Sequence, residues 1–232
     1  MTSPESRFRG VENQLYRVEI HAEATGLGPA TFKWSRENAS VVFPITKING
    51  TQVTVGHLGR DERYGLEIGD WVEVVDDDYI LAGKADALLQ VEDLDRETRV
   101  VTLSGIPTVS SAQPLTRHPL LRRWESPDGL KVEVSGTPEI WLPLENGVEI
   151  LFVLDKTTAS FKTGDYWLIP ARVATGDVEW PGTAKEPEAL LPHGVQHYYA
   201  PLAVIELNAS GTINSSAAPA GDGRRKFNPL AQ

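Results

Sequence analysis

The stretch LEIGDWVEV at residues 66–74 has a counterpart later in the chain, FKTGDYWLI at residues 161–169. Both copies place an apolar residue, two intervening residues, a Gly-Asp pair and an aromatic residue in the same order. Glycine can adopt positive φ, and an aspartate side chain can accept hydrogen bonds from nearby backbone, so each pair favours a tight turn that leads into a strand. We therefore predict structural turns at Gly69, Asp70, Gly164 and Asp165, and two β modules in tandem.

Short-range patterns around these turns also favour strands. Tyr16, Val18 and Ile20 alternate with polar residues, and a period of two predicts a half-buried strand. Asn-Gly pairs at 49–50 and 146–147 lie between apolar runs, which is the strongest short signal for a hairpin. The nearly continuous apolar run at 148–154 predicts a buried central strand. No amphipathic helix is evident.

The predicted fold is all-β, with two tandem small β-barrel or β-sandwich-like modules, long loops and little helix. Its expected organisation is a lead-in at residues 1–13, a first module at 14–105, a linker at 106–119, a second module at 120–213, and a linker with a C-terminal tail at 214–232. Proline- and glycine-rich residues 176–195 predict a long irregular loop, and such loops often carry function.

Composition excludes several classes of function. The 232-residue chain has a formal net charge of −10 and only small basic clusters, which argues against nucleic-acid binding. It contains no cysteine, so disulfides and thiolate chemistry are excluded. No apolar run approaches the roughly 18 residues of a membrane span, and no secretory signal follows Met1, so we expect synthesis in the cytoplasm without membrane insertion.

No motif predicts a cofactor. His193 and His197 are four residues apart, and only a helix would place both on one face to chelate a metal. Pro192 and Gly194 favour a loop instead, so hydrogen-bonded loop histidines are the preferred interpretation and a metal site is the alternative. The run 76–78 of three aspartates lacks the spacing of a calcium loop and predicts a solvated turn.

Two regions are candidates for contact with a ligand or partner. Trp180 lies in the irregular loop, and we expect it to be exposed there. His193 and His197 are further candidates for contact with a ligand or partner. The tail carries a Ser/Ala/Pro/Gly linker and then a basic and aromatic tip that includes Arg224, Arg225 and Phe227. A linker raises the effective concentration of such a tip, so it predicts docking by self-association or onto another subunit.

Four stretches carry a family resemblance: RGVENQLYRVEIH at 9–21, TFKWSREN at 31–38, GDYWLIPAR at 164–172, and PHG followed by HYYAPLA in 192–203. They resemble a bacterial family of unknown function, whose members resemble components encoded near phage-tail-like contractile injection particles. The resemblance implies a larger protein, because family members carry a long segment before the ENQLY stretch. It also implies a cysteine where this chain has Gly223.

The resemblance implies a non-enzymatic structural or adaptor component of such a particle, with other particle subunits as partners and release from the cell within the particle. One alternative is a surface carbohydrate-binding module that recognises a glycan on a target cell. A second alternative is a glycan-acting enzyme, for which the sequence nominates no catalytic residue. A glycan array and a substrate-turnover assay distinguish these three functions.

Overall fold

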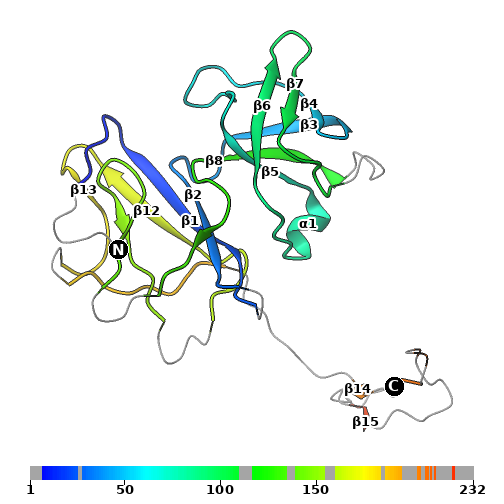
Figure 1. Ribbon diagram of the computed structural model, residues 1–232. Coiled ribbons are helices and arrows are strands. Elements are labelled where there is room, and N and C mark those ends of the chain that lie inside the picture. The colour runs from blue at the N-terminus through cyan, green and yellow to red at the C-terminus, as the bar shows by residue number, and fades with distance from the viewer. Residues whose placement is uncertain are drawn as a thin grey trace, which may run out of the picture. The chain divides into compact units, whose positions relative to one another are not determined.

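The computed structural model describes residues 7–25, 28–109, 117–134, 139–154, 160–183, 186–194, 203–204, 207–208, 210, 212 and 221–222. Its described residues form strands and one short helix, which confirms the predicted all-β class (Figure 1). The chain divides into two compact units, Met1–Gly194 and Val195–Gln232, and each is described by itself.

A closed barrel forms one part of the first unit, with the strand order β3-β4-β7-β6-β5-β8. Its strands are β3 (Val42–Asn49), β4 (Gln52–Val55), β5 (Trp71–Val75), β6 (Leu89–Asp95), β7 (Val100–Leu103) and β8 (Leu120–Trp124). The Asn49-Gly50 pair joins β3 to β4, as predicted. Apolar side chains fill the interior, and Phe43, Val53 and Leu121 are fully buried there.

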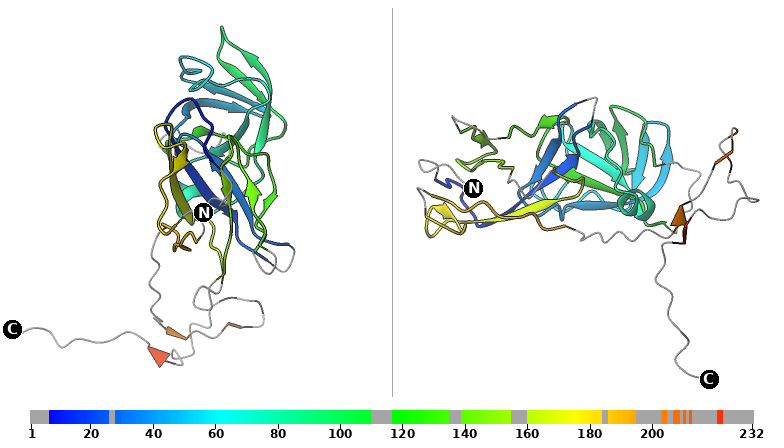
Figure 2. Two further views of the ribbon diagram at one scale, coloured as in Figure 1. Left: turned by 90° about the vertical axis from the view of Figure 1, so that its left-hand side faces the viewer. Right: turned by 90° about the horizontal axis from the view of Figure 1, so that it is seen from below.

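A five-stranded sheet forms the other part, with the order β13-β12-β1-β2-β9. Its strands are β1 (Gln14–Ala22), β2 (Thr31–Ser35), β9 (Leu130–Lys131), β12 (Tyr166–Arg172) and β13 (Asp177–Val178). Figure 2 shows the blue β1 beside the yellow β12, and in this pair Val18 lies opposite Trp167. Strands distant in sequence therefore form the centre of this sheet.

Strand pairing corrects the predicted module boundaries. β1 and β2 lie within the predicted first module, but they pair with β12 and β9 from the predicted second module. β8 also lies in the predicted second module, but it closes the barrel between β3 and β5. The prediction assigned strands by their order along the chain, whereas long-range antiparallel pairing decides which sheet each strand joins.

The apolar run at 148–154 is not a central strand, so that prediction was wrong. β11 (Glu149–Ile150) pairs only with β10 (Leu142–Pro143), through the Asn146-Gly147 turn. Ile150 and Phe152 are buried, whereas Val153 and Leu154 are exposed. The segment therefore covers one face of the five-stranded sheet, and its side chains join the core of that sheet.

The lead-in and the acidic run also differ from the predictions. Phe8 is buried in the core of the five-stranded sheet, so the described part of the lead-in is packed. Asp76 is buried and caps the helix α1 (Asp77–Leu81), because its carboxylate accepts the backbone N–H of Tyr79 at 2.7 Å. In the part of the chain that the structure describes, no helix has the length and hydrophobicity needed to cross a membrane.

In the second unit, β14 (Ala203–Val204) pairs with β15 (Gly221–Asp222). The prediction instead paired 202–207 with 211–213, through a turn at Ser210-Gly211. The Asn208 N–H still donates to the Thr212 carbonyl at 2.9 Å, which is consistent with a local turn at this point.

The two Gly-Asp turns have the same conformation. Gly69 has a φ of 97° and Gly164 a φ of 87°, a region that favours glycine. In each turn the aspartate carboxylate accepts the backbone N–H three residues earlier, at 2.9 Å for Asp70 and 3.0 Å for Asp165. These contacts agree with the predicted turns.

Each turn is also fixed to the neighbouring strand in the same way. Gly69 donates its N–H to the Val91 carbonyl at 2.8 Å, and Val91 donates back to the Asp70 carbonyl at 2.9 Å. Gly164 and Asp165 exchange the same two bonds with Ile20, at 2.9 and 2.8 Å. The repeated motif therefore sets the register of β5 on β6 in the barrel and of β12 on β1 in the sheet.

We predict that Asp70→Ala and Asp165→Ala each lower the free energy of unfolding by about 1 kcal/mol, because each leaves a turn N–H without its acceptor. Urea denaturation measures the change. Asp70→Asn is the matched control: its side-chain oxygen keeps an acceptor for the Glu67 N–H, so it should lose less stability than Asp70→Ala. Unchanged midpoints in both alanine variants would contradict the capping role.

Candidate functional site

The two faces of β1 have different chemistry. Tyr16, Val18 and Ile20 belong to the apolar core of the five-stranded sheet. The sequence predicts a solvated opposite face, but Glu19 and His21 are buried there as well. The half-buried prediction was therefore wrong, because the polar face lies in a buried ionic network that includes a carboxylate from the barrel.

That network is centred on Lys33 of β2. Its ammonium lies 2.8 Å from both carboxylate oxygens of Glu73 in β5 and 3.4 Å from Glu19. It also lies 4.5 Å from the ring centroid of Trp124, whose indole N–H donates to Glu73 at 3.1 Å. Burial is the largest single effect on the Glu73 carboxyl and would raise its pKa, but the charge of Lys33, the Lys33 hydrogen bonds and the nearby His21 and Arg122 together hold that pKa below its usual value.

His21 extends the network. Its Nε2 lies 2.8 Å from the Asp86 carbonyl, which can only accept, so Nε2 carries the hydrogen in the neutral ring. The buried Nδ1 has no hydrogen-bond partner among the described residues. Burial lowers the pKa of His21 and the Lys33 charge lowers it further, against the opposing charges of Glu73 and Asp128. Burial and the Lys33 charge therefore both favour the neutral ring.

A second charged cluster lies around Arg36, Arg63 and Arg123. Arg36 binds Glu145 at 2.7 Å, Arg63 binds Glu37 at 2.6 Å, and Arg123 donates at 2.5 Å to the carbonyl oxygens of Arg63 and Gly65. Burial raises the pKa of Glu37 and of Glu125, as a general acid would need. Both carboxylates nevertheless accept donors from within the fold, since Glu125 accepts the Arg36 N–H at 3.2 Å.

These clusters are internally paired. Lys33, Arg36 and Arg123 each contact partners from more than one segment, which is the arrangement expected for groups that hold two β bodies together. Within the described residues, no group of three or more His, Cys, Asp or Glu side chains is arranged to hold a metal ion. The Lys33–Glu73 contact joins the five-stranded sheet to the barrel, which gives this network a structural role.

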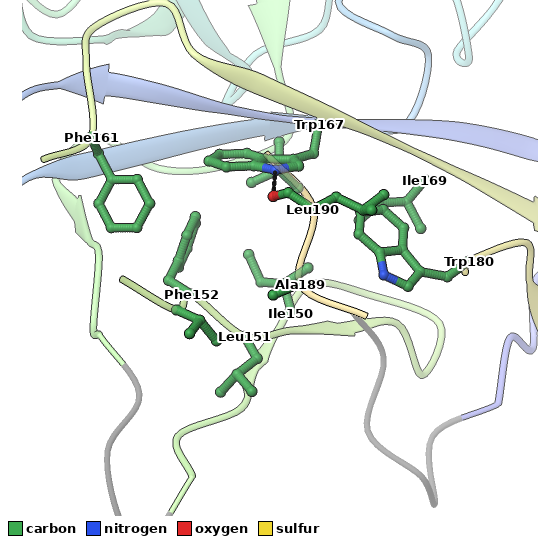
Figure 3. Close-up of a pocket in the computed structure, with 11 residues that line it drawn as sticks. Ile150, Leu151, Phe152, Phe161, Trp167, Ile169, Trp180, Ala189 and Leu190 are labelled. Carbon is green, nitrogen blue, oxygen red and sulfur yellow. Dashed lines mark hydrogen bonds between the residues drawn. The ribbon is translucent and has the colours of Figure 1, made fainter. Parts of the chain in front are cut away.

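An apolar pocket opens on the other face of the five-stranded sheet (Figure 3). β1 and β12 supply its base, the 150–153 segment one wall, and the loop that contains Trp180 and Leu190 another. The lining side chains are Val18, Ile150, Leu151, Phe152, Val153, Phe161, Trp167, Ile169, Trp180, Ala189 and Leu190.

Aromatic rings give the pocket its shape. Phe152, Phe161 and Trp167 pack at steep angles to one another, with ring centroids 5.6–6.2 Å apart. In Figure 3, Trp180 lies across the pocket from Phe161 and Phe152. Because these rings support one another, the apolar surface is preformed.

The polar groups of the pocket are already occupied. The Trp167 indole N–H donates to the Leu190 carbonyl at 2.9 Å, and the Trp180 indole N–H donates to the Glu188 carbonyl at 2.8 Å. These bonds fix the loop over the sheet, and every lining side chain is apolar or aromatic. Its volume of about 50 Å³ is well below the roughly 150 Å³ of a cavity that holds benzene, so it has room for a small apolar group and not for a whole ring.

Exposed apolar side chains surround the opening. Val153 and Leu190 line the pocket and are 42% and 41% exposed, and their chain neighbours Leu154 and Leu191 are 40% and 72% exposed. Exposed apolar residues are ordinary when scattered, but a group around a preformed pocket is typical of an interaction site. The pocket is therefore the candidate functional site.

The structure brings one of the predicted contact residues into this site. Trp180 lines the pocket, but it is half-buried rather than exposed, because its ring packs on the sheet core. His193 is exposed and pairs through its backbone with Tyr166, at 2.7 and 2.8 Å. His197, Arg224, Arg225 and Phe227 lie outside the described residues.

Sequence reasoning missed the other aromatic residues of the site. Phe152 and Phe161 are apolar residues in apolar surroundings and were indistinguishable from ordinary core. Trp167 follows the second Gly-Asp turn, and its position in β12 gave the only signal. That signal needs the strand pairing before it can be interpreted.

The fold is all-β, and its five-stranded sheet carries an apolar pocket. Residues 1–214 match the model of a family described as "Family of unknown function (DUF6519)". The chain belongs to this family. No curated protein and no solved structure matches the chain.

We predict that Lys33→Met lowers the free energy of unfolding by about 3–5 kcal/mol, because Glu73 then stays buried without its cation. The double variant Lys33→Met/Glu73→Gln should be destabilised by at least about 2 kcal/mol less than Lys33→Met alone. Glutamine removes the buried charge, and its side-chain oxygen still accepts the Trp124 indole N–H. Urea denaturation of the four proteins gives the coupling energy. Additive losses would show that the pair does not act as a unit.

Acidification should weaken the first unit through His21. Its folded pKa lies below the unfolded value, so the unfolded state takes up the proton first. The stability that the neutral ring provides is present above about pH 6.5 and is lost as the pH falls toward the folded pKa. Unfolding free energies between about pH 7.5 and pH 5 measure this loss.

His21→Gln is the matched control for that experiment, because glutamine keeps a donor for the Asp86 carbonyl and does not titrate. Its stability should change less over the same pH range than that of the wild-type protein. An identical pH dependence in both proteins would assign the effect to other groups.

Proposed function

We propose that the chain is a non-enzymatic structural or adaptor component of a phage-tail-like contractile injection particle. Its pocket on the five-stranded sheet receives an aliphatic side chain from a neighbouring protein subunit. The particle assignment rests on the sequence resemblance of residues 9–230. The docking assignment rests on the pocket itself.

A single observation carries the docking assignment: the pocket has a preformed aromatic wall, and both of its indole N–H groups are already bonded. Burying an aliphatic group there is favourable by about 25 cal/mol for each Å² removed from water. No lining side chain is charged. An apolar side chain anchored in such a pocket is a common centre of a protein–protein interface.

A carbohydrate-binding module is the second candidate, favoured by the indole rings of Trp167 and Trp180. Sugar hydroxyls lose free energy when buried without hydrogen bonds, and the indole donors are committed to Leu190 and Glu188. The cavity of about 50 Å³ is also small for a pyranose ring. These features favour a protein side chain over a glycan.

A glycan-acting enzyme is supported less well. Glu37 and Glu125 have raised pKa values, but both are engaged by arginine or backbone donors and neither lines the pocket. Retaining and inverting glycosidases need two carboxyl groups that flank a substrate bond. A glycan array tests the second candidate, and turnover of polysaccharide or cell-wall substrates tests this one.

Co-sedimentation tests the proposed function. Particles are prepared from the organism that encodes the chain, carrying either the wild-type protein or Leu190→Asp, and the bound protein is quantified by mass spectrometry. We predict that wild-type protein sediments with the particles and that Leu190→Asp is reduced at least about tenfold, because a buried carboxylate in the interface is costly.

Ile106→Asp is the matched control, since Ile106 is a 71% exposed apolar residue outside the pocket. It should sediment like the wild-type protein. Thermal unfolding confirms that both variants are folded. Absence of the wild-type protein from the particle fraction would contradict the particle assignment, and full retention of Leu190→Asp would contradict the docking assignment.

A further inference from the structure

We infer, resting on the proposed function, that the subunit seated in this pocket presents its aliphatic side chain between basic residues. The pocket itself favours an apolar side chain of the partner. The charges around the pocket determine which residues are favoured on either side of that side chain in the partner. Those charges are set by the loop that forms the Trp180 wall.

The loop wall carries acidic side chains at the rim of the pocket. Glu188 immediately precedes the lining residue Ala189, and its carbonyl accepts the indole N–H of Trp180 at 2.8 Å. Glu186 lies two residues earlier, in a turn closed by Thr183. Both glutamates are exposed, and neither forms an ion pair with another described residue. Their backbone belongs to the loop that forms the Trp180 wall.

Nearby basic side chains are already committed. Arg172 of β12 binds Glu179 at 2.9 Å, and Lys162 binds Glu23 at 3.1 Å. Residues 177–190 contain four acidic residues and one lysine, which agrees with the acidic balance of the whole chain. Among the described residues, the uncommitted charges of this loop wall are therefore negative.

Rim charges around an apolar anchor act in a defined way. They attract an oppositely charged partner, repel a like-charged one and leave the buried anchor unchanged. Each exposed pair contributes little, and salt screens it beyond a Debye length of about 8–10 Å. The partner's basic residues should therefore raise affinity severalfold at low salt, whereas the aliphatic side chain is needed at any salt concentration.

Three synthetic peptides test the inference on the full chain. The first, Gly-Lys-Lys-Leu-Lys-Gly, carries both features. The second replaces each lysine by glutamate, and the third replaces the leucine by serine. Binding is followed by the ¹⁵N–¹H signals of the Trp167 and Trp180 indoles, which Trp→Phe variants assign.

The lysine–leucine peptide should shift both indole signals and bind at least about fivefold more tightly than the glutamate–leucine peptide at low salt. The serine peptide should leave both signals unchanged. Glu186→Gln/Glu188→Gln should remove the preference between the two leucine peptides. Glu92→Gln/Glu97→Gln is the matched control, because it removes two exposed charges from the β6–β7 region. This variant should still prefer the lysine–leucine peptide.

Equal affinity for the two leucine peptides, or no shift of either indole with any peptide, would overturn the inference. The co-sedimentation experiment tests the proposed function independently. A failure of this inference can therefore be distinguished from a failure of the proposed function. Loss of charge preference with normal sedimentation would refute only the basic neighbours. A peptide of residues 222–232 is a further probe: if it binds in place of the lysine–leucine peptide, a second copy of this chain is the source of the occupant.

Discussion

The buried ion pair between Lys33 and Glu73 is the interaction on which the first unit depends. Lys33 belongs to the five-stranded sheet and Glu73 to the barrel, so their contact at 2.8 Å joins two separately paired β bodies. A buried charge is tolerated only when it is paired and hydrogen-bonded. Glu19 and Trp124 complete that pairing. The pair therefore makes the polar face of β1 and β2 compatible with burial.

This arrangement explains how the pocket is held in place. β1 is buried on both faces: its charged face belongs to the network, and Val18 on the other face forms part of the pocket base. The second Gly-Asp turn fixes β12 on β1, and β12 carries Trp167 into the pocket. A docking site on such a framework needs little reorganisation when it binds, which favours affinity.

Local features of the fold could be predicted from the sequence, because they depend on neighbouring residues. The Gly-Asp turns and the Asn-Gly hairpins require only positive φ and a nearby acceptor. Sheet membership could not be predicted, since the pairing of Val18 with Trp167 joins segments far apart in the chain. The same limit applied to the site. Phe152, Phe161 and Trp167 became recognisable as one wall only after β1 and β12 were paired.

The central claim is that another protein inserts an aliphatic side chain at the pocket. Photo-crosslinking on assembled particles tests it most directly, with p-benzoylphenylalanine in place of Leu191, which is 72% exposed beside the pocket. The account predicts a crosslink to a particle protein or a second copy of the chain, mapped by mass spectrometry to a segment with an aliphatic residue. A particle-bound chain that forms no protein crosslink at this position would contradict it.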